Sequence, residues 1–149
     1  TTIPSYLTAR PSRDIVQAAR QQLTREWWDV ERRHYDLCIS QIVLDEAAAG
    51  DPEAAQRRMA VIANLPLLDL TVEVDGLAEQ IMQSGLLPVS ASRDAVHIAV
   101  TAIHQVQFLL TWNCRHIANA TMFRDLQHII RNAGYDMPVI CTPEELLGD

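Results

Sequence analysis

Three polar residues, Glu46, Asp94 and Asn113, are candidates for metal binding or catalysis because they lie in or directly beside apolar segments. Asp94 falls in the first turns of an Ala-rich helix predicted over residues 90–105, whose apolar arc is wide enough for a mostly buried helix. Glu46 falls inside the apolar arc of the helix predicted after Ser40, and Asn113 directly follows an apolar run. A carboxylate on a mostly buried helix needs a partner, such as a cation.

The donor types indicate which cation this could be. Carboxylate and amide oxygens are hard ligands, so they favour Mg²⁺ or Mn²⁺ over zinc. The three cysteines (38, 114 and 141) are too far apart for a C-x-x-C site, and they suit a reducing compartment. An alternative stays open for Asp94: with His97, Thr101 and His104 it forms a narrow polar stripe that could simply face water.

Short apolar runs alternate with amphipathic segments along the whole chain. Strands are predicted at 35–40, 67–70, 107–112 and 137–141. Helices are predicted at 12–34, 40–49, 51–63, 71–84, 90–105 and 119–133, with a short last one from 142. This alternation predicts a parallel sheet with helices on both faces, in which ligands bind beyond the carboxyl ends of the strands. Glu46, Asp94 and Asn113 are therefore expected to converge at that edge.

The composition excludes several classes of function. The 149 residues, 48% of them apolar, are enough for one domain over 1–149. All 12 basic residues are arginines, which excludes Lys-dependent chemistry such as the Walker phosphate loop, and no G-x-G dinucleotide fingerprint occurs. With a net charge of −7, nucleic acid could be bound only through a local arginine cluster or metal ions. No membrane-spanning stretch or signal peptide is recognisable, so the expected location is the cytoplasm.

Four motifs occur in the order typical of one family. They are Thr1-Thr2-Ile3-Pro4-Ser5-Tyr6-Leu7, Ile39-Ser40-Gln41-Ile42-Val43-Leu44-Asp45-Glu46, Asp94-Ala95-Val96-His97-Ile98-Ala99 and Leu109-Leu110-Thr111-Trp112-Asn113. In these motifs the chain resembles the PIN domain, and most of all the VapC-like toxins of bacterial type II toxin–antitoxin systems. The resemblance implies a three-layer α/β/α fold with a central parallel sheet of four to five strands. It also implies an endoribonuclease that uses Mg²⁺ or Mn²⁺ to activate a water, with a cognate antitoxin protein as partner.

The resemblance also assigns residues. Glu46 and Asp94 match two metal-binding, catalytic acids of the family, and Asn113 stands where many members have a third, an Asp. A further family acid ends the first strand and would stand immediately before Thr1, so we expect the native chain to begin earlier, with a short apolar strand ending in Asp. Supporting roles fall to Thr1, Thr2 and Thr111, as hydrogen-bond partners of the carboxylates, and to His97, which orients Asp94 or packs in the core.

Contacts to RNA are expected from the loops that flank this site. The candidates are Arg10, Arg13, Arg115 and His116. Trp27 and Trp28 are adjacent, so one is expected in the core and the other at a homodimer or antitoxin contact. The alternative to the enzyme is a catalytically weak PIN-like module that binds RNA or protein.

Overall fold

The computed structural model describes residues 1–148, and these divide into two compact units. Unit 1 comprises residues 1–67, the segment 110–112 and the chain from Cys141 onward. Unit 2 comprises residues 68–109 and 113–140. The chain passes from one unit to the other several times, so neither unit is a continuous stretch of sequence.

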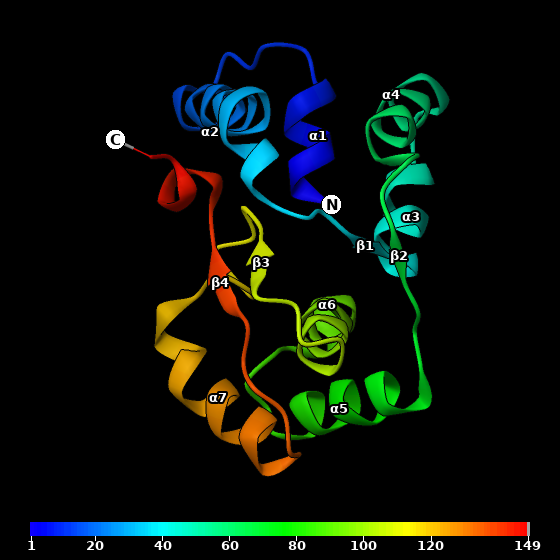
Figure 1. Cartoon of the computed structure of the whole chain (residues 1–149), viewed down its shortest axis with the longest axis vertical. Helices are drawn as coiled ribbons and strands as arrows, with labels where there is room; N and C mark the ends of the chain where they lie inside the picture. Colours follow the sequence, from blue (N-terminus) through cyan, green and yellow to red (C-terminus); the bar gives the residue numbers. More distant parts are fainter. Residues whose placement is uncertain (149) are drawn as a thin grey trace. The chain divides into compact units, whose positions relative to one another are not determined.

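Unit 1 is built mainly from helices (Figure 1). They are α1 (Thr2–Thr8), α2 (Ile15–Glu26), α3 (Gln41–Ala48) and α4 (Pro52–Ile62), with a π-helical turn η1 (Trp27–Glu31) and the 3₁₀ turns η2 (Arg32–His34) and η5 (Pro143–Leu146). Helix α1 packs against α2 and α4, and α3 packs against α4. Side chains cap two of these helices, because the carboxylates of Asp14 and Asp51 accept hydrogen bonds from the backbone at Gln17 and Ala54.

Trp112 anchors the interior of unit 1. Its side chain is buried, and the indole Nε1 donates a hydrogen bond of 2.7 Å to Oγ1 of Thr24. The Arg20 guanidinium lies 5.3 Å from the centre of the Trp112 ring, and Tyr6 contacts the same ring edge-on. Trp112 is thus a core residue of unit 1.

Unit 2 has a helical core. Its helices are α5 (Val72–Gln83), α6 (Ser92–Ile103) and α7 (Phe123–Asn132), with the 3₁₀ turns η3 (Val89–Ala91) and η4 (Ala120–Met122). Helix α5 packs against α6 and also contacts α7 (Figure 1). Small alanines on α6, including Ala95 and Ala99, are fully buried and allow this close packing.

The strands are too few and too short for the predicted sheet, so the expected three-layer α/β/α PIN-like fold is wrong for this structure. Among the described residues there are two separate two-stranded parallel sheets, β1 (Ile39–Ser40) with β2 (Leu67–Leu68) and β3 (Phe108–Leu110) with β4 (Val139–Cys141). No central sheet of four to five strands joins them in the described part of the chain. Apolar runs predict where a strand can form, whereas a sheet also requires neighbouring backbones that pair with it.

Most predicted helices are confirmed, but one region differs in its winding. The helix predicted over 12–34 is regular only to Glu26 and continues through η1 and η2. Of the adjacent tryptophans in η1, Trp27 is buried as expected, and the Arg32 guanidinium lies 4.3 Å from the centre of the Trp28 ring; the expected contact of Trp28 with another chain stays a prediction. Within residues 1–148, no helix has the length and apolar character required to cross a bilayer.

Candidate functional site

Asp94 lies in the first turn of α6, immediately after the 3₁₀ turn η3. A carboxylate is favoured there because the N-terminal end of a helix carries partial positive charge. The next residue, Ala95, is fully buried, while the Asp94 side chain keeps 18% of its surface exposed. The carboxylate therefore sits at the boundary between the core of unit 2 and solvent.

Asn113 begins a tight turn three residues after the end of β3. Its backbone oxygen accepts hydrogen bonds from the N–H groups of Ile117, at 3.1 Å, and Ala118, at 2.8 Å. Its side-chain Oδ1 accepts a third from the backbone N–H of His116, at 3.1 Å. These bonds fold residues 113–118 into a compact loop that holds the Asn113 and His116 side chains on the same side.

Asp94, Asn113 and His116 form one hydrogen-bonded group, which we call the Asp94 cluster. Asn113 Nδ2 donates to Asp94 Oδ1 at 3.0 Å, and His116 Nδ1 lies 2.9 Å from Asp94 Oδ2. Because an ionised carboxylate only accepts hydrogen bonds, the geometry assigns the donor role to His116 Nδ1. Each carboxylate oxygen thus has one protein donor and retains a further lone-pair direction.

The polar stripe of α6 that includes Asp94 is partly buried, so it does not simply face water. His97 is 6% exposed and Thr101 is 7% exposed, so the middle of the stripe is buried in unit 2. Thr101 Oγ1 donates to the backbone oxygens of His97 and Ile98, the usual way a helix accommodates a buried threonine. His97 therefore has the core position that was one of its two expected roles.

Glu46 lies in unit 1, on α3, with 21% of its side chain exposed. Its Oε2 lies 3.9 Å from the backbone nitrogen of Thr1. The Thr2 hydroxyl accepts a hydrogen bond of 2.9 Å from the backbone N–H of Trp112. It also lies 3.4 Å from Oγ1 of Thr111. The predicted support of a carboxylate by these threonine hydroxyls, and the Asp expected before Thr1, stay predictions.

The structure brings two of the three predicted catalytic residues together. Asp94 and Asn113, 19 residues apart in sequence, are in direct contact within unit 2. Glu46 belongs to unit 1, so its convergence with them stays a prediction. Of the expected RNA contacts, Arg10, Arg13 and Arg115 are exposed, and their role stays a prediction as well.

His116 is the residue whose position differs most from its expected role as a phosphate contact. Its ring makes a hydrogen bond to Asp94 and is only 22% exposed. The spacing of three residues from Asn113 is compatible with this arrangement, but the bond forms only because residues 113–118 fold into a tight turn, which spacing alone does not determine.

A divalent cation has one strong ligand at this site. Among the described residues, no group of three or more His, Cys, Asp or Glu side chains is placed to hold a metal. The Asp94 cluster offers one carboxylate, one amide and one imidazole. Mg²⁺ commonly binds through one or two carboxylates together with waters and substrate phosphates, so the donor chemistry fits a cation that is bound mainly with the substrate.

Comparisons with protein-family models, curated proteins and solved structures find no match to this chain. The likeness to PIN domains accordingly depends on the four sequence motifs alone.

Proposed function

We propose that this chain is a divalent-cation-dependent endoribonuclease, with the Asp94 cluster at its reactive centre. The observation that carries the proposal is the carboxylate of Asp94, which is held in one orientation by Asn113 and His116 and is still accessible at its edge. A carboxylate held in a fixed orientation by hydrogen bonds is a ligand of the type that a hard cation prefers. The toxin role in a toxin–antitoxin pair, with an antitoxin partner, belongs to the same proposal and derives from the motif resemblance.

The side chains of the cluster have separate tasks. Asn113 fixes Oδ1 of Asp94, and the Asn113 side chain is itself fixed by the backbone N–H of His116. His116 fixes Oδ2 through Nδ1, so its other ring nitrogen, Nε2, lies on the opposite side of the ring. The carboxylate is thereby oriented before substrate arrives, which reduces the reorganisation needed during the reaction.

When bound, Mg²⁺ or Mn²⁺ supplies Lewis acidity toward a phosphodiester oxygen and the hydrolytic water. The chain itself supplies the negative charge of Asp94 and the fixed geometry around it. The exposed Arg115, in the turn that begins at Asn113, is placed to contact the phosphate backbone of a bound strand.

One observation favours a second candidate, a module that binds RNA or protein without cleavage. Both oxygens of Asp94 already have a protein donor, so the carboxylate is satisfied without a cation. The cluster also lacks a second carboxylate among the described residues of unit 2. Such a site could have a structural function only, tying the turn after β3 to α6.

Cleavage of a labelled single-stranded RNA by the purified chain separates the candidates. The reaction is run with Mg²⁺, with Mn²⁺ and with EDTA, and the products are resolved by length. The enzyme predicts internal cleavage with either cation and none in EDTA. Cleavage that continues unchanged in EDTA contradicts the proposed mechanism, and binding without cleavage under all conditions supports the binding module.

A further inference from the structure

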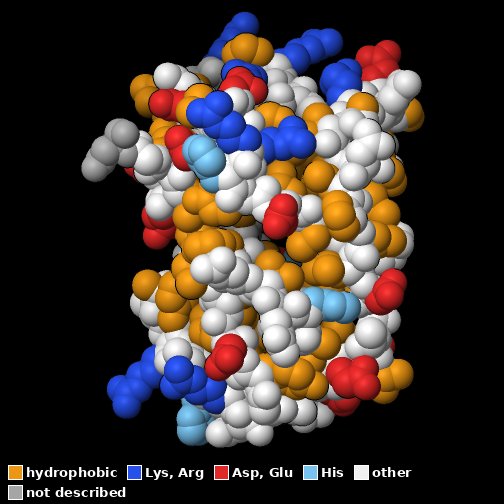
Figure 2. Space-filling model, viewed as in Figure 1, with side chains coloured by type: hydrophobic (Ala, Val, Ile, Leu, Met, Phe, Trp, Pro, Cys, Tyr) orange, Lys and Arg blue, Asp and Glu red, His pale blue; other side chains and the backbone are white. Residues whose placement is uncertain are grey.

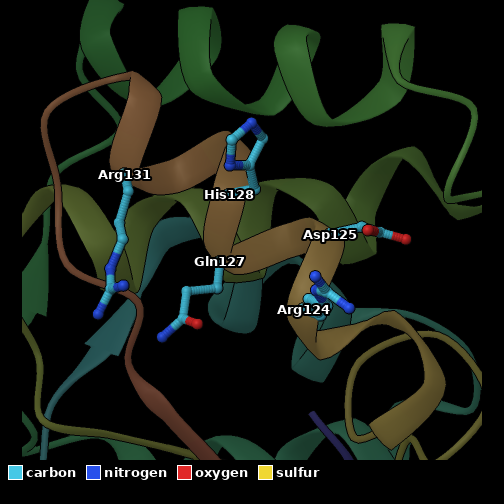
Figure 3. A pocket seen from close by; sticks show the side chains of 5 residues that line it. All are labelled: Arg124, Asp125, Gln127, His128 and Arg131. Carbon is cyan, nitrogen blue, oxygen red and sulfur yellow. The ribbon is translucent and has the colours of Figure 1, made fainter.

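The solvent-facing side of α7 carries a row of polar side chains. Figure 3 shows Arg124, Gln127 and Arg131 along the helix, with Asp125 and His128 beside them. Together these residues line a shallow depression of about 450 Å³. Leu126 and Ile130, on the other side of the same helix, are fully buried in the core of unit 2. Because the apolar face of α7 is buried in the core, its polar face points to solvent.

Arg124, Gln127 and Arg131 recur at i, i+3 and i+7, so they lie on one face of the helix. Over seven residues an α-helix rises about 10 Å, which separates the two guanidinium groups along the axis. Figure 2 shows arginine side chains gathered over α7 at the lower left of the molecule. We call Arg124, Gln127 and Arg131 the α7 row.

The arginines of this row differ from many others in the chain because they have no partner. Elsewhere Arg20 and Arg32 stack on tryptophans, Arg25 and Arg58 donate to backbone oxygens, and Arg57 pairs with Glu53. Neither Arg124 nor Arg131 has a hydrogen bond or an ion pair with any residue in the range 1–148. The chain has a net charge of −7, so two unpaired guanidinium groups on one helix face form a positive patch on a negatively charged protein.

Asp125 is the acid nearest in sequence to the row. It lies in the first turn of α7, where it stabilises the N-terminal end of the helix. In Figure 3 its side chain points away from Gln127 and Arg131. Its charge consequently reduces the positive potential of the row without blocking either guanidinium.

We propose that the α7 row binds the sugar–phosphate backbone of single-stranded RNA; the choice of RNA rests on the proposed function. Guanidinium groups bind phosphate oxygens through paired, charge-assisted hydrogen bonds. The separation of the two arginines places them on different phosphates of one strand, and the Gln127 amide between them has both a donor and an acceptor for ribose hydroxyls. The row would hold the strand while cleavage takes place at the Asp94 cluster.

The test measures RNA binding in EDTA, so cleavage does not interfere. Fluorescence anisotropy follows a short labelled single-stranded RNA across a salt series, with the whole chain and an R124Q/R131Q variant. The R124Q/R131Q variant should bind RNA with an affinity about tenfold lower than the parent chain. The slope of log K against log salt concentration should be about 1.4 less steep, because each lost phosphate contact removes about 0.7 from that slope. The matched control, R33Q/R57Q, changes the net charge equally but alters arginines of unit 1 and should bind almost as the parent chain does.

Three results would overturn the inference: no binding by the parent chain, equal losses in both double variants, or displacement of RNA by polyglutamate as effectively as by unlabelled RNA. Thermal unfolding confirms that both variants are folded. Cleavage with Mg²⁺, measured separately, distinguishes the two proposals. If the parent chain cleaves RNA and the α7 variant binds normally, only the α7 inference fails; if binding depends on α7 and no cleavage occurs, only the nuclease proposal fails.

Discussion

The Nδ1 atom of His116 lies 2.9 Å from Oδ2 of Asp94, which joins the turn after β3 to the first turn of α6. Asn113 makes a second connection between the same two segments, at 3.0 Å. The Asp94 cluster thus has a stabilising role that is measurable apart from any catalysis.

Replacing His116 by Ala should lower the free energy of unfolding by about 1–2 kcal/mol, because a partly exposed hydrogen bond to a charged group is lost. His116→Asn is the matched control, since the asparagine amide can occupy nearly the position of Nδ1 and donate to Asp94. Urea unfolding measures both variants. Equal stability of His116→Ala and the parent chain would mean that the contact contributes nothing to the fold.

In unit 1, Thr24→Val tests the buried bond from Trp112. Valine matches threonine in shape but cannot accept a hydrogen bond, so the indole N–H would lose its 2.7 Å partner inside the core. A buried donor without a partner costs about 1–3 kcal/mol. Thr24→Ser keeps the hydroxyl and should lose less, although it removes a methyl group. Chemical denaturation compares the two, and a smaller loss in the valine variant would contradict this assignment.

Gln105 offers a stabilising substitution. It has a φ of +53°, the one non-glycine residue with positive φ in the described chain, and it follows the end of α6. Because glycine adopts this conformation without steric cost, Gln105→Gly should raise stability by about 0.5–1 kcal/mol. Gln107→Gly, two residues later, should lower stability slightly, because glycine there gains only freedom in the unfolded chain. The melting temperatures of the two variants should shift in opposite directions.

The cysteines should differ in their response to alkaline pH. Burial, and secondly the negative charge of Glu145, raise the pKa of Cys141 from 9.0 to about 11. The folded chain therefore holds this proton more tightly than the unfolded chain does, so stability is fully present below pH 9 and falls as the pH rises toward 11. Cys141→Ala should lose less stability over this range.

Exposed Cys114 should react with a maleimide near neutral pH well before Cys141, and the reverse order would contradict the assigned burial.

The helices could be predicted because their ends have strong local signals. Asp51 and Pro52 begin α4, and Gly85 and Gly134, both with positive φ, follow the ends of α5 and α7. Helix α1 was not predicted, since it is only seven residues long and depends on packing against α2 and α4. The sheet was predicted incorrectly because strand pairing joins distant segments, and residue patterns do not specify the partners.

The same distinction applies to the site. The polar placement of Asp94 and Asn113 was visible in the helix pattern and at the strand end, and their contact across 19 residues is confirmed. The bond from His116 to Asp94 depends on the turn geometry after β3, which residue types alone do not determine. The burial of His97 depends on tertiary packing, which the stripe pattern left open.

RNA cleavage by the Asp94→Asn variant tests the central claim most directly. Asparagine keeps the size of the side chain and an oxygen that accepts from Asn113, its amide NH₂ can donate to His116 Nδ1 once that ring takes its other tautomer, and the charge that attracts a cation is removed. Asp75→Asn, which removes an exposed carboxylate of the same unit outside both proposed sites, is the control. With Mg²⁺, the Asp94 variant should cleave RNA at least about a hundredfold more slowly at nearly unchanged stability, while the Asp75 variant remains active. Equal cleavage rates in the Asp94 variant and the parent chain would contradict the account.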